Sequence, residues 1–271
     1  LLSPFAPTDV DREVRHGVDA VRYSLPLSKT SLLDVLWLPQ KQGWAQGGVV
    51  RGQANFKGFD VSLSAAKYVS DVVFGADTTG DIGPLGVHVE AGYTLGLSNL
   101  DGGGRVEVAE QFLRGVAGLE WRPAERWTVG AEYYFNGFGA GDPSGYAAKL
   151  RSPRVTSGEV FGAGRHYLGL TAVRKATQLL TLQATILGNL ADPSALAVPM
   201  VEYWASQRVL VRAGAYLPLG RGPAAGPLQG LTLADVVGMS PPFVEATSTL
   251  GLRSEYGASP AGLFAQLGVY F

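Results

Sequence analysis

The sequence predicts an all-β fold, namely a transmembrane antiparallel up-and-down β-barrel with about 12–14 strands in this chain. Three observations predict it. Apolar and polar residues alternate over segments of about ten residues. The connections between these segments fall into a short set and a longer set that alternate along the chain. Aromatic residues gather at the ends of the segments.

The alternation is clear in "VVRGQANF", where Val50, Ala54 and Phe56 share one parity while Arg51 and Gln53 share the other. A strand points successive side chains to opposite faces, so this pattern gives each strand one apolar and one polar face. We predict strands near residues 18–27, 31–39, 48–57, 59–69, 72–81, 85–97, 108–122, 126–138, 165–174, 178–190, 197–206, 208–218 and 261–271.

The connections separate by length. "FKG", "RPAER" and "ASQR" are short, whereas "SNLDGGGRVEVAEQ" and the stretch 219–260 are long. A barrel whose two ends face different compartments connects its strands in this way. We therefore expect one barrel domain over residues 1–271, in which 1–17 form an irregular or extramembrane segment and 219–260 form a long extracellular loop.

Composition narrows the class of protein. The chain is 46% hydrophobic and 17% charged, and its formal net charge is -1. The absence of a basic excess speaks against nucleic acid as a partner. There is no cysteine, so disulfide and thiolate chemistry are excluded. The longest apolar candidate for a spanning helix, "ATQLLTLQATILGNLA", is shorter than the ~20 residues such a helix needs.

A soluble antiparallel sandwich is the main alternative, because its strands also alternate and bury their apolar face. Two features favour the membrane barrel. A sandwich has no reason to sort its connections into two alternating length classes. Trp37, Trp121, Trp127 and Trp204 stand near segment ends, as in the aromatic girdles at membrane interfaces.

The end of the sequence, "LFAQLGVYF", places Phe271, Val269 and Leu267 on one parity and finishes on an aromatic residue. It resembles the last strand of bacterial outer-membrane β-barrel proteins of the porin-like kind. The family often has Tyr where this chain has Val269. The resemblance implies location in the outer membrane of a Gram-negative bacterium, contact with its lipid, and recognition of Phe271, Val269 and Leu267 by the barrel-assembly machinery as an assembly signal.

Strand parity bears on the size of the barrel. Single-chain bacterial barrels have even strand numbers. The thirteen predicted strands therefore indicate either a fragment of a larger barrel with about 14 or more strands, or a barrel of about 12 or 14 strands whose closure includes residues 1–17.

The polar parity of the strands supplies candidate lumen residues. We predict that the pore is lined by Arg51, Gln53, Asn55, Asp60, His88, Glu90, Arg114, Glu120, Glu132, Thr181, Gln183, Glu202 and Arg212. A barrel of this size is wider than the eight-stranded kind that side chains fill. Lining charges of both signs either bias what passes or form ion pairs between strands, and the sequence leaves both open for each residue.

No catalytic residue, metal site or cofactor is predicted. His88 and Glu90 share a face, but no third metal ligand accompanies them in the sequence. Ser62, Ser64 and His88 fall on nearby strands, yet no nucleophile motif such as Gly-x-Ser-x-Gly supports a hydrolase.

Two functions remain. The first is an outer-membrane channel for passive diffusion of small polar solutes. The alternative is a non-channel barrel, either a plugged structural or surface-binding protein or a hydrophobic-ligand transporter. The polar lining favours the first, and the apolar part of 219–260, "PLQGLTLADVVGMSPPF", favours the second. Neither the solute, nor an ion preference, nor the oligomeric state follows from the sequence.

Overall fold

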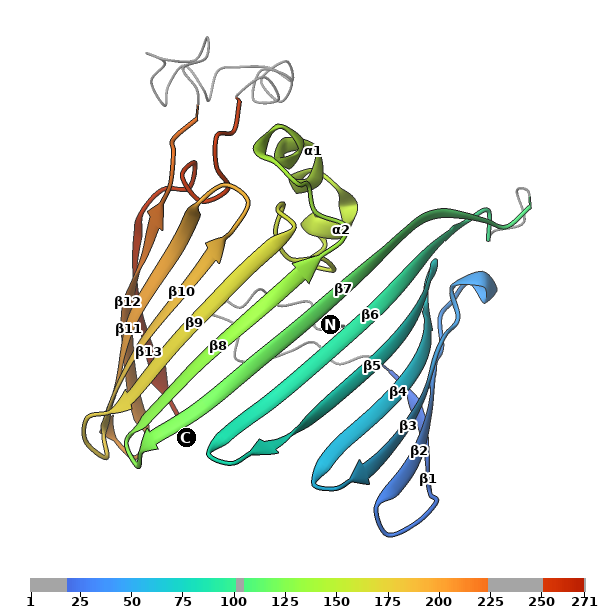
Figure 1. The fold of residues 1–271 in the computed structure, drawn as a ribbon, viewed down its shortest axis with the longest axis horizontal. Coiled ribbons are helices and arrows are strands. Elements are labelled where there is room, and N and C mark those ends of the chain that lie inside the picture. Colours follow the sequence, from blue (N-terminus) through green and yellow to red (C-terminus); the bar gives the residue numbers. More distant parts are fainter. Residues whose placement is uncertain (1–18, 101–104, 224–250, 271) are drawn as a thin grey trace. The chain divides into compact units, whose positions relative to one another are not determined.

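The strands of the protein follow one another in the sheet in the order of the chain. A computed structural model describes residues 19–100, 105–223 and 251–270. These residues form thirteen strands in one antiparallel up-and-down sheet (Figure 1). The strands are β1 (Val21–Pro26), β2 (Ser31–Leu38), β3 (Gly47–Phe56), β4 (Phe59–Tyr68), β5 (Asp71–Ile82), β6 (Leu85–Ser98), β7 (Glu107–Ala124), β8 (Trp127–Asn136), β9 (His166–Lys175), β10 (Leu180–Asn189), β11 (Ser194–Ser206), β12 (Val209–Leu219) and β13 (Gly262–Val269).

All thirteen predicted strands are confirmed, and most boundaries agree within a few residues. The short connections are tight turns. At the β3–β4 hairpin, Lys57 and Gly58 both adopt positive φ, 52° and 87°. Two such residues make the turn whose twist matches the strands that it joins.

The described helical turns are short. A 3-10 turn, η1 (Gly43–Ala45), precedes β3, and three elements lie between β8 and β9: η2 (Pro143–Gly145), α1 (Tyr146–Leu150) and α2 (Pro153–Thr156). Asp142 caps η2 by accepting a hydrogen bond from Ser144 N, and Ser152 caps α2 by accepting one from Arg154 N. No helix in the described part of the chain has the length and hydropathy needed to cross a membrane.

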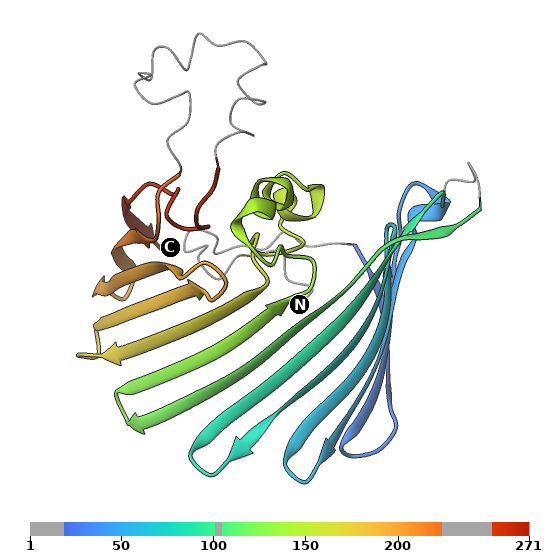
Figure 2. The same cartoon turned by 45° about the horizontal axis from the view of Figure 1, so that its top comes forward.

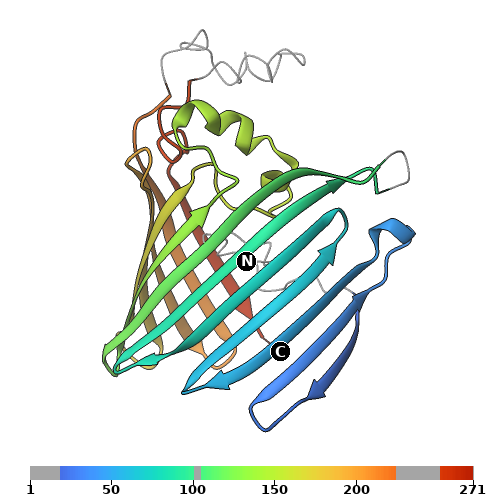
Figure 3. The ribbon, with the colours of Figure 1, turned by 45° about the vertical axis from the view of Figure 1, so that its right-hand side comes forward.

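The chain divides into two compact units. The N-terminal unit comprises Leu1–Trp121 and Glu132–Phe138, and the C-terminal unit comprises Arg122–Ala131 and Gly139–Phe271. In the N-terminal unit, long neighbouring strands run side by side from β2 to β7 (Figure 3). In the C-terminal unit, α1 and α2 lie at the same strand ends as the segment that leads into β13 (Figure 2).

The described sheet has two edge strands. Within the described residues, β1 pairs with β2 and β13 pairs with β12, and no pairing joins β1 to β13. The predicted all-β, antiparallel, up-and-down architecture is thus confirmed. Residues 1–17 and most of the predicted loop 219–260 lie outside the described residues.

The strand register gives each unit two faces of different chemistry. Residues directly opposite each other on antiparallel strands point to the same side of a sheet. One such row in the N-terminal unit is Tyr23, Val35, Val50, Ala65, Phe74, Tyr93 and Leu113. In the C-terminal unit, a corresponding row is Leu180, Tyr203, Val211 and Leu267. The period-two pattern of the sequence therefore produces a continuous apolar face in each unit.

The apolar faces are exposed. Leu63 is 67% exposed and Leu263 is 88% exposed, and most of the other large apolar side chains on these faces are exposed as well. The buried hydrophobic side chains gather elsewhere. In the C-terminal unit they include Tyr146, Val160 and Tyr167, at the strand ends covered by α1 and α2.

Candidate functional site

The polar faces of the two units carry the candidate site. In the N-terminal unit, one register row contains Ser24, Asp34, Arg51, Ser64, Gly75, Gly92 and Arg114. The next rows contain Gln53, Ser62, Asp77 and Glu90, and then Asn55, Asp60, Thr79, His88 and Gly118. The structure thus brings the predicted residues of this unit together on one face of its sheet. Their role as pore-lining residues stays a prediction.

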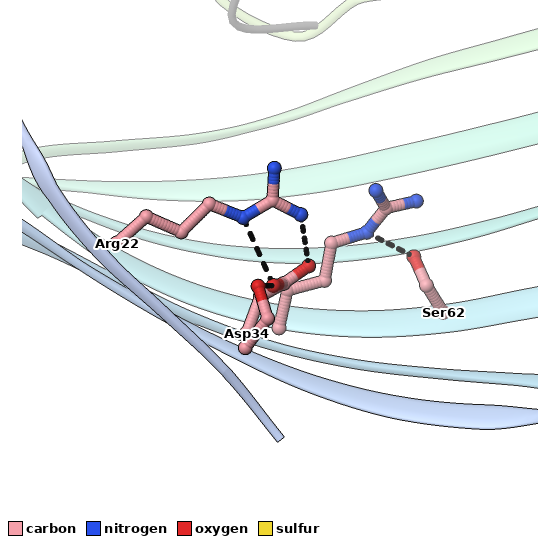
Figure 4. Close-up of polar contacts among 5 residues, drawn as sticks. Arg22, Asp34 and Ser62 are labelled. Atoms are coloured by element: carbon pink, nitrogen blue, oxygen red, sulfur yellow. Dashed lines mark hydrogen bonds and ion pairs between the residues drawn. The ribbon is translucent and has the colours of Figure 1, made fainter. Parts of the chain in front are cut away.

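An ion pair with charge-assisted hydrogen bonds lies on this face at the first two strands, β1 and β2. Arg22 Nε and Nη2 donate to the two carboxylate oxygens of Asp34 over 3.0 and 2.8 Å, and Ser24 Oγ donates to Asp34 Oδ1 over 2.5 Å (Figure 4). A guanidinium that donates to both oxygens of a carboxylate forms a stronger interaction than a single hydrogen bond does, and it also fixes the relative orientation of the two side chains. The pair therefore ties β1 to β2 through side chains.

The next cation continues the network across three strands. Arg51, opposite Asp34 in the register, donates from Nε to Ser62 Oγ over 3.0 Å and from Nη2 to Asp77 Oδ1 over 3.2 Å. Ser62 Oγ donates in turn to Asp77. Figure 4 shows Ser62 on the same side of the strands as Arg22 and Asp34. Acids and bases thus alternate along this part of the face.

His88 and Glu132 form a second polar pair. His88 Nε2 lies 3.1 Å from Glu132 Oε2. The imidazole ring lies over Gly118, where an added Cβ would stand 2.1 Å from the ring carbon Cε1. A side chain at this glycine would therefore displace the ring. His88 thus contacts a carboxylate, while Glu90, two residues further along β6, lies opposite Asp77.

Further carboxylates lie in the register row of His88 or on the strands next to it. Asp60 Oδ1 accepts a hydrogen bond from Asn55 Nδ2 over 2.9 Å. Asp81 and Glu120 lie on either side of Gly86, since both stand within 3.7 Å of the position of an added Cβ there. The polar face of the N-terminal unit therefore carries an acidic region.

Arg114 differs from the other predicted residues of this face. It is only 3% exposed, and its guanidinium carbon lies 5.5 Å from the centre of the Phe112 ring. Phe112 also makes an edge-on contact with Phe138, with ring centres 5.4 Å apart. The arginine is therefore packed among aromatic rings and offers little surface to solvent.

The polar face of the C-terminal unit carries a smaller network. Thr181, Glu202, Arg212 and Gln266 form one row across β10 to β13. Arg212 donates from Nε to Glu202 Oε2 over 2.8 Å and from Nη1 to Gln266 Oε1 over 3.3 Å. Gln183 Nε2 donates to Thr185 Oγ1 over 3.4 Å. The predicted residues of this unit therefore also share one face.

A buried polar cluster stands at one end of that face, centred on Glu255. Its Oε1 accepts a hydrogen bond from Ala163 N over 2.8 Å. Its Oε2 accepts hydrogen bonds from Tyr167 Oη over 2.6 Å and from Asn189 Nδ2 over 2.7 Å. Tyr167 and Asn189 are opposite each other on β9 and β10, on the polar parity of those strands.

Asp192 supports Glu255 from the β10–β11 turn. Its Oδ2 accepts a hydrogen bond from Glu255 N over 2.6 Å, and its Oδ1 accepts one from Ser194 N over 3.0 Å. Ser194 Oγ accepts one from Tyr256 N over 3.3 Å. Burial raises the pKa of the Tyr256 hydroxyl, and the negative charges of Glu255 and Asp192 raise it further. This hydroxyl is thus kept protonated.

The predicted assembly signal lies partly on a described strand. Leu267 and Val269 stand on the exposed apolar face of β13 together with Leu263. Phe271 lies outside the described residues. The role of these residues in recognition stays a prediction.

The sequence did not single out two groups of this site. In β2, Asp34 shares its face with Leu32 and Leu36, so the alternation gives no sign of a polar partner for Arg22. Glu255 lies in a connection and meets residues 92 and 66 positions away in the chain.

Among residues 19–100, 105–223 and 251–270, no group of three or more histidine, aspartate or glutamate side chains is placed to hold a metal ion. His88 contacts Glu132, and His16 lies outside the described residues.

Comparison with known proteins adds no assignment. No family model matches the sequence, and the searches of curated proteins and of solved structures found no match.

Proposed function

We propose that the protein is an outer-membrane channel for passive diffusion of small polar solutes, in which both apolar faces contact lipid and both polar faces line a water-filled lumen. The observation that carries the proposal is the pairing of an exposed apolar face with a charged face in the same strands. In water, a contiguous apolar surface of this extent would need a covering partner. In a bilayer, lipid covers it.

Aromatic residues near strand ends support the same proposal. Trp37, Trp121 and Trp127 are exposed near the ends of β2, β7 and β8. Trp204 stacks on Tyr270, with ring centres 5.8 Å apart, near the ends of β11 and β13. Amphipathic rings at strand ends settle at the level of lipid headgroups.

Barrel closure is part of the proposal. In an up-and-down order, β1 and β13 run in the same direction, whereas all paired strands are antiparallel. Antiparallel closure requires an even number of strands. We therefore propose that at least one further strand, outside the thirteen described, completes the barrel. The barrel-assembly machinery would recognise the β13 end during insertion.

A second candidate is a plugged, non-channel barrel, with a structural or surface-binding role or with a hydrophobic ligand. The observation that favours it is the Glu255 cluster, which fastens residues near α1 and α2 to polar-face side chains of β9 and β10. Residues held on that face would narrow or fill the lumen of the barrel.

Single-channel conductance in a planar lipid bilayer tests the proposal, using the full-length gene product refolded in detergent. Discrete current steps proportional to voltage are expected. A barrel that migrates with the heat-modifiable mobility of a folded form, yet inserts without conducting, would contradict the channel and favour the plugged alternative.

A further inference from the structure

Two segments of the C-terminal unit that are far apart in sequence meet at one carboxylate. The first, residues 139–165, contains η2, α1 and α2, and the second, residues 251–260, leads into β13. Glu255 of the second segment accepts a hydrogen bond from the Ala163 amide of the first. Neither segment is part of a strand ladder, so these contacts hold them at the strand ends.

Tyr167 and Asn189 connect this junction to the sheet. The Tyr167 hydroxyl donates to Glu255 and accepts a hydrogen bond from Gly164 N over 2.6 Å. Asn189 Nδ2 donates to Glu255 and also to Tyr146 Oη, which belongs to α1, over 3.0 Å. Tyr146, Tyr167 and Asn189 are almost completely buried. One carboxylate therefore joins both segments to β9 and β10.

The charge balance of the cluster is unusual. Glu255 and Asp192 are adjacent carboxylates, and none of the hydrogen-bond partners that the structure gives them is a lysine, arginine or histidine. Among the residues that the structure describes, the other titratable groups facing Glu255 are the hydroxyls of Tyr146, Tyr167 and Tyr256. With both acids ionised, the described residues of the cluster would hold a buried negative charge on Asp192 and a half-buried one on Glu255 without a cation. Such an arrangement favours proton uptake by Glu255.

Burial raises the pKa of Glu255 above 4.5, the ordinary value, and the charge of Asp192 adds to this rise. The hydrogen bonds from Tyr167, Ala163 and Asn189 oppose it without cancelling it. A carboxyl whose pKa is higher in the assembled cluster than in the released one stabilises the assembly fully below the ordinary pKa. This stabilisation is lost as the pH rises through the raised pKa.

We propose that the Glu255 cluster is a proton-operated latch, which holds residues 139–165 on the polar face of β9 and β10 when Glu255 is protonated and releases them when Glu255 ionises. The latch itself stands on the geometry of the C-terminal unit. Its consequence for transport, a wider lumen at higher pH, rests on the proposed channel function.

Hydrogen exchange of the folded full-length protein in detergent tests the latch. The reporter is the peptide that contains the amides of Ala163 and Gly164, since both donate to the cluster. After correction for the intrinsic pH dependence of exchange, its protection should fall as the pH rises from about 4 to about 8, and each unit by which the pKa of Glu255 is raised in the cluster corresponds to a tenfold loss of protection. A peptide from β10 should keep its protection over the same range, which excludes global unfolding.

Two variants distinguish the titration of Glu255 from other effects of pH on this segment. Glu255→Gln removes the titrating group, so the protection of the reporter should no longer change with pH. Asp142→Asn is the matched control. Asp142 is an exposed carboxylate of the same segment, where it accepts a hydrogen bond from Ser144 N and does not contact Glu255. This variant should keep the wild-type profile.

Wild-type protection that is independent of pH would overturn the latch, as would a pH-dependent loss that persists in Glu255→Gln. If Glu255→Gln fails to refold, Tyr167→Phe decides, because it removes a hydrogen bond that lowers the pKa of Glu255. The midpoint of the transition should then move to higher pH, and an unmoved midpoint would contradict the proposal.

Conductance recorded over the same pH range separates the two proposals. A protein that shows the exchange transition but never conducts would retain the latch and lose the channel. A protein that conducts with exchange independent of pH would retain the channel and lose the latch.

Discussion

At the scale of single residues, glycines decide how closely backbone segments approach the Glu255 cluster. An added Cβ at Gly164 would stand 2.3 Å from Asn189 Nδ2 and 3.0 Å from the Tyr167 hydroxyl. An added Cβ at Gly139 would stand 1.8 Å from the carbonyl oxygen of Gly164. Gly162 adopts a φ of 77°, a conformation that other residues rarely adopt. The cluster can thus form only because side chains are missing at these positions.

Gly164→Ala tests this point. Because the methyl group would overlap with Asn189 and Tyr167, we expect a loss of about 1–3 kcal/mol in the free energy of unfolding, as for overpacked sites. Gly141→Ala is the control, since the nearest atom to its added Cβ, in Arg165, is 4.0 Å away. Urea unfolding followed by tryptophan fluorescence measures both variants. Equal stability of the two would show that the close approach does not matter.

At the scale of the strands, β3 and β4 carry apolar side chains on one face and polar side chains on the other. Leu63 lies opposite Gly52 and Ala76 on the apolar face and is 67% exposed. Gln53 lies opposite Ser62 on the polar face. Shifting the register by one residue would exchange the two faces. The environment of each face is therefore a property of the whole strand.

Leu63→Lys and Gln53→Lys test which face meets lipid. A lysine on a lipid-facing position near the middle of a bilayer costs about 2–4 kcal/mol, whereas a lumen position tolerates it. We expect Leu63→Lys to lower the unfolding free energy in lipid vesicles by this amount, and Gln53→Lys to change it little. Two variants of equal stability would speak against membrane insertion with this orientation.

At the scale of the molecule, the described polar faces differ in charge. In the N-terminal unit, carboxylates outnumber cationic side chains on the polar face. The carboxylates include Asp34, Asp60, Asp71, Asp77, Asp81, Glu90, Glu110, Glu120 and Glu132, and the cationic or titratable basic side chains on this face of the described strands of this unit are Arg22, Arg51, Arg114 and His88. On the C-terminal unit, Glu202 and Arg212 balance each other. Acidic side chains in a pore favour cations.

The salt-gradient reversal potential of the channel should therefore show a preference for cations. Neutralising two carboxylates together, by Asp60→Asn and Asp81→Asn, should reduce this preference measurably. Glu125→Gln removes a negative charge from the exposed β7–β8 turn and serves as the control. An unselective wild-type channel, or one that prefers anions, would contradict the assignment of this face to the lumen.

Much of the strand architecture could be predicted, because the information is local. Alternation over about ten residues defines a strand and its two faces without knowledge of the neighbours. The boundaries are less sharp: β11 begins at Ser194, whereas the prediction began at residue 197. The candidate polar residues follow from the same parity, and the register places Arg51, Asp60 and His88 on one face.

The succession of strands and the charged side of each strand follow from the amino-acid sequence alone, because strand geometry repeats every two residues. Which charges meet depends on the folded chain. Arg22 meets Asp34 across a hairpin, and Glu255 meets Ala163 from 92 residues away. Such contacts depend on pairing register and on connections folding back over strand ends, and no local pattern encodes them. The pairing of Glu255 with Asp192 in a buried cluster is therefore a property of the folded chain.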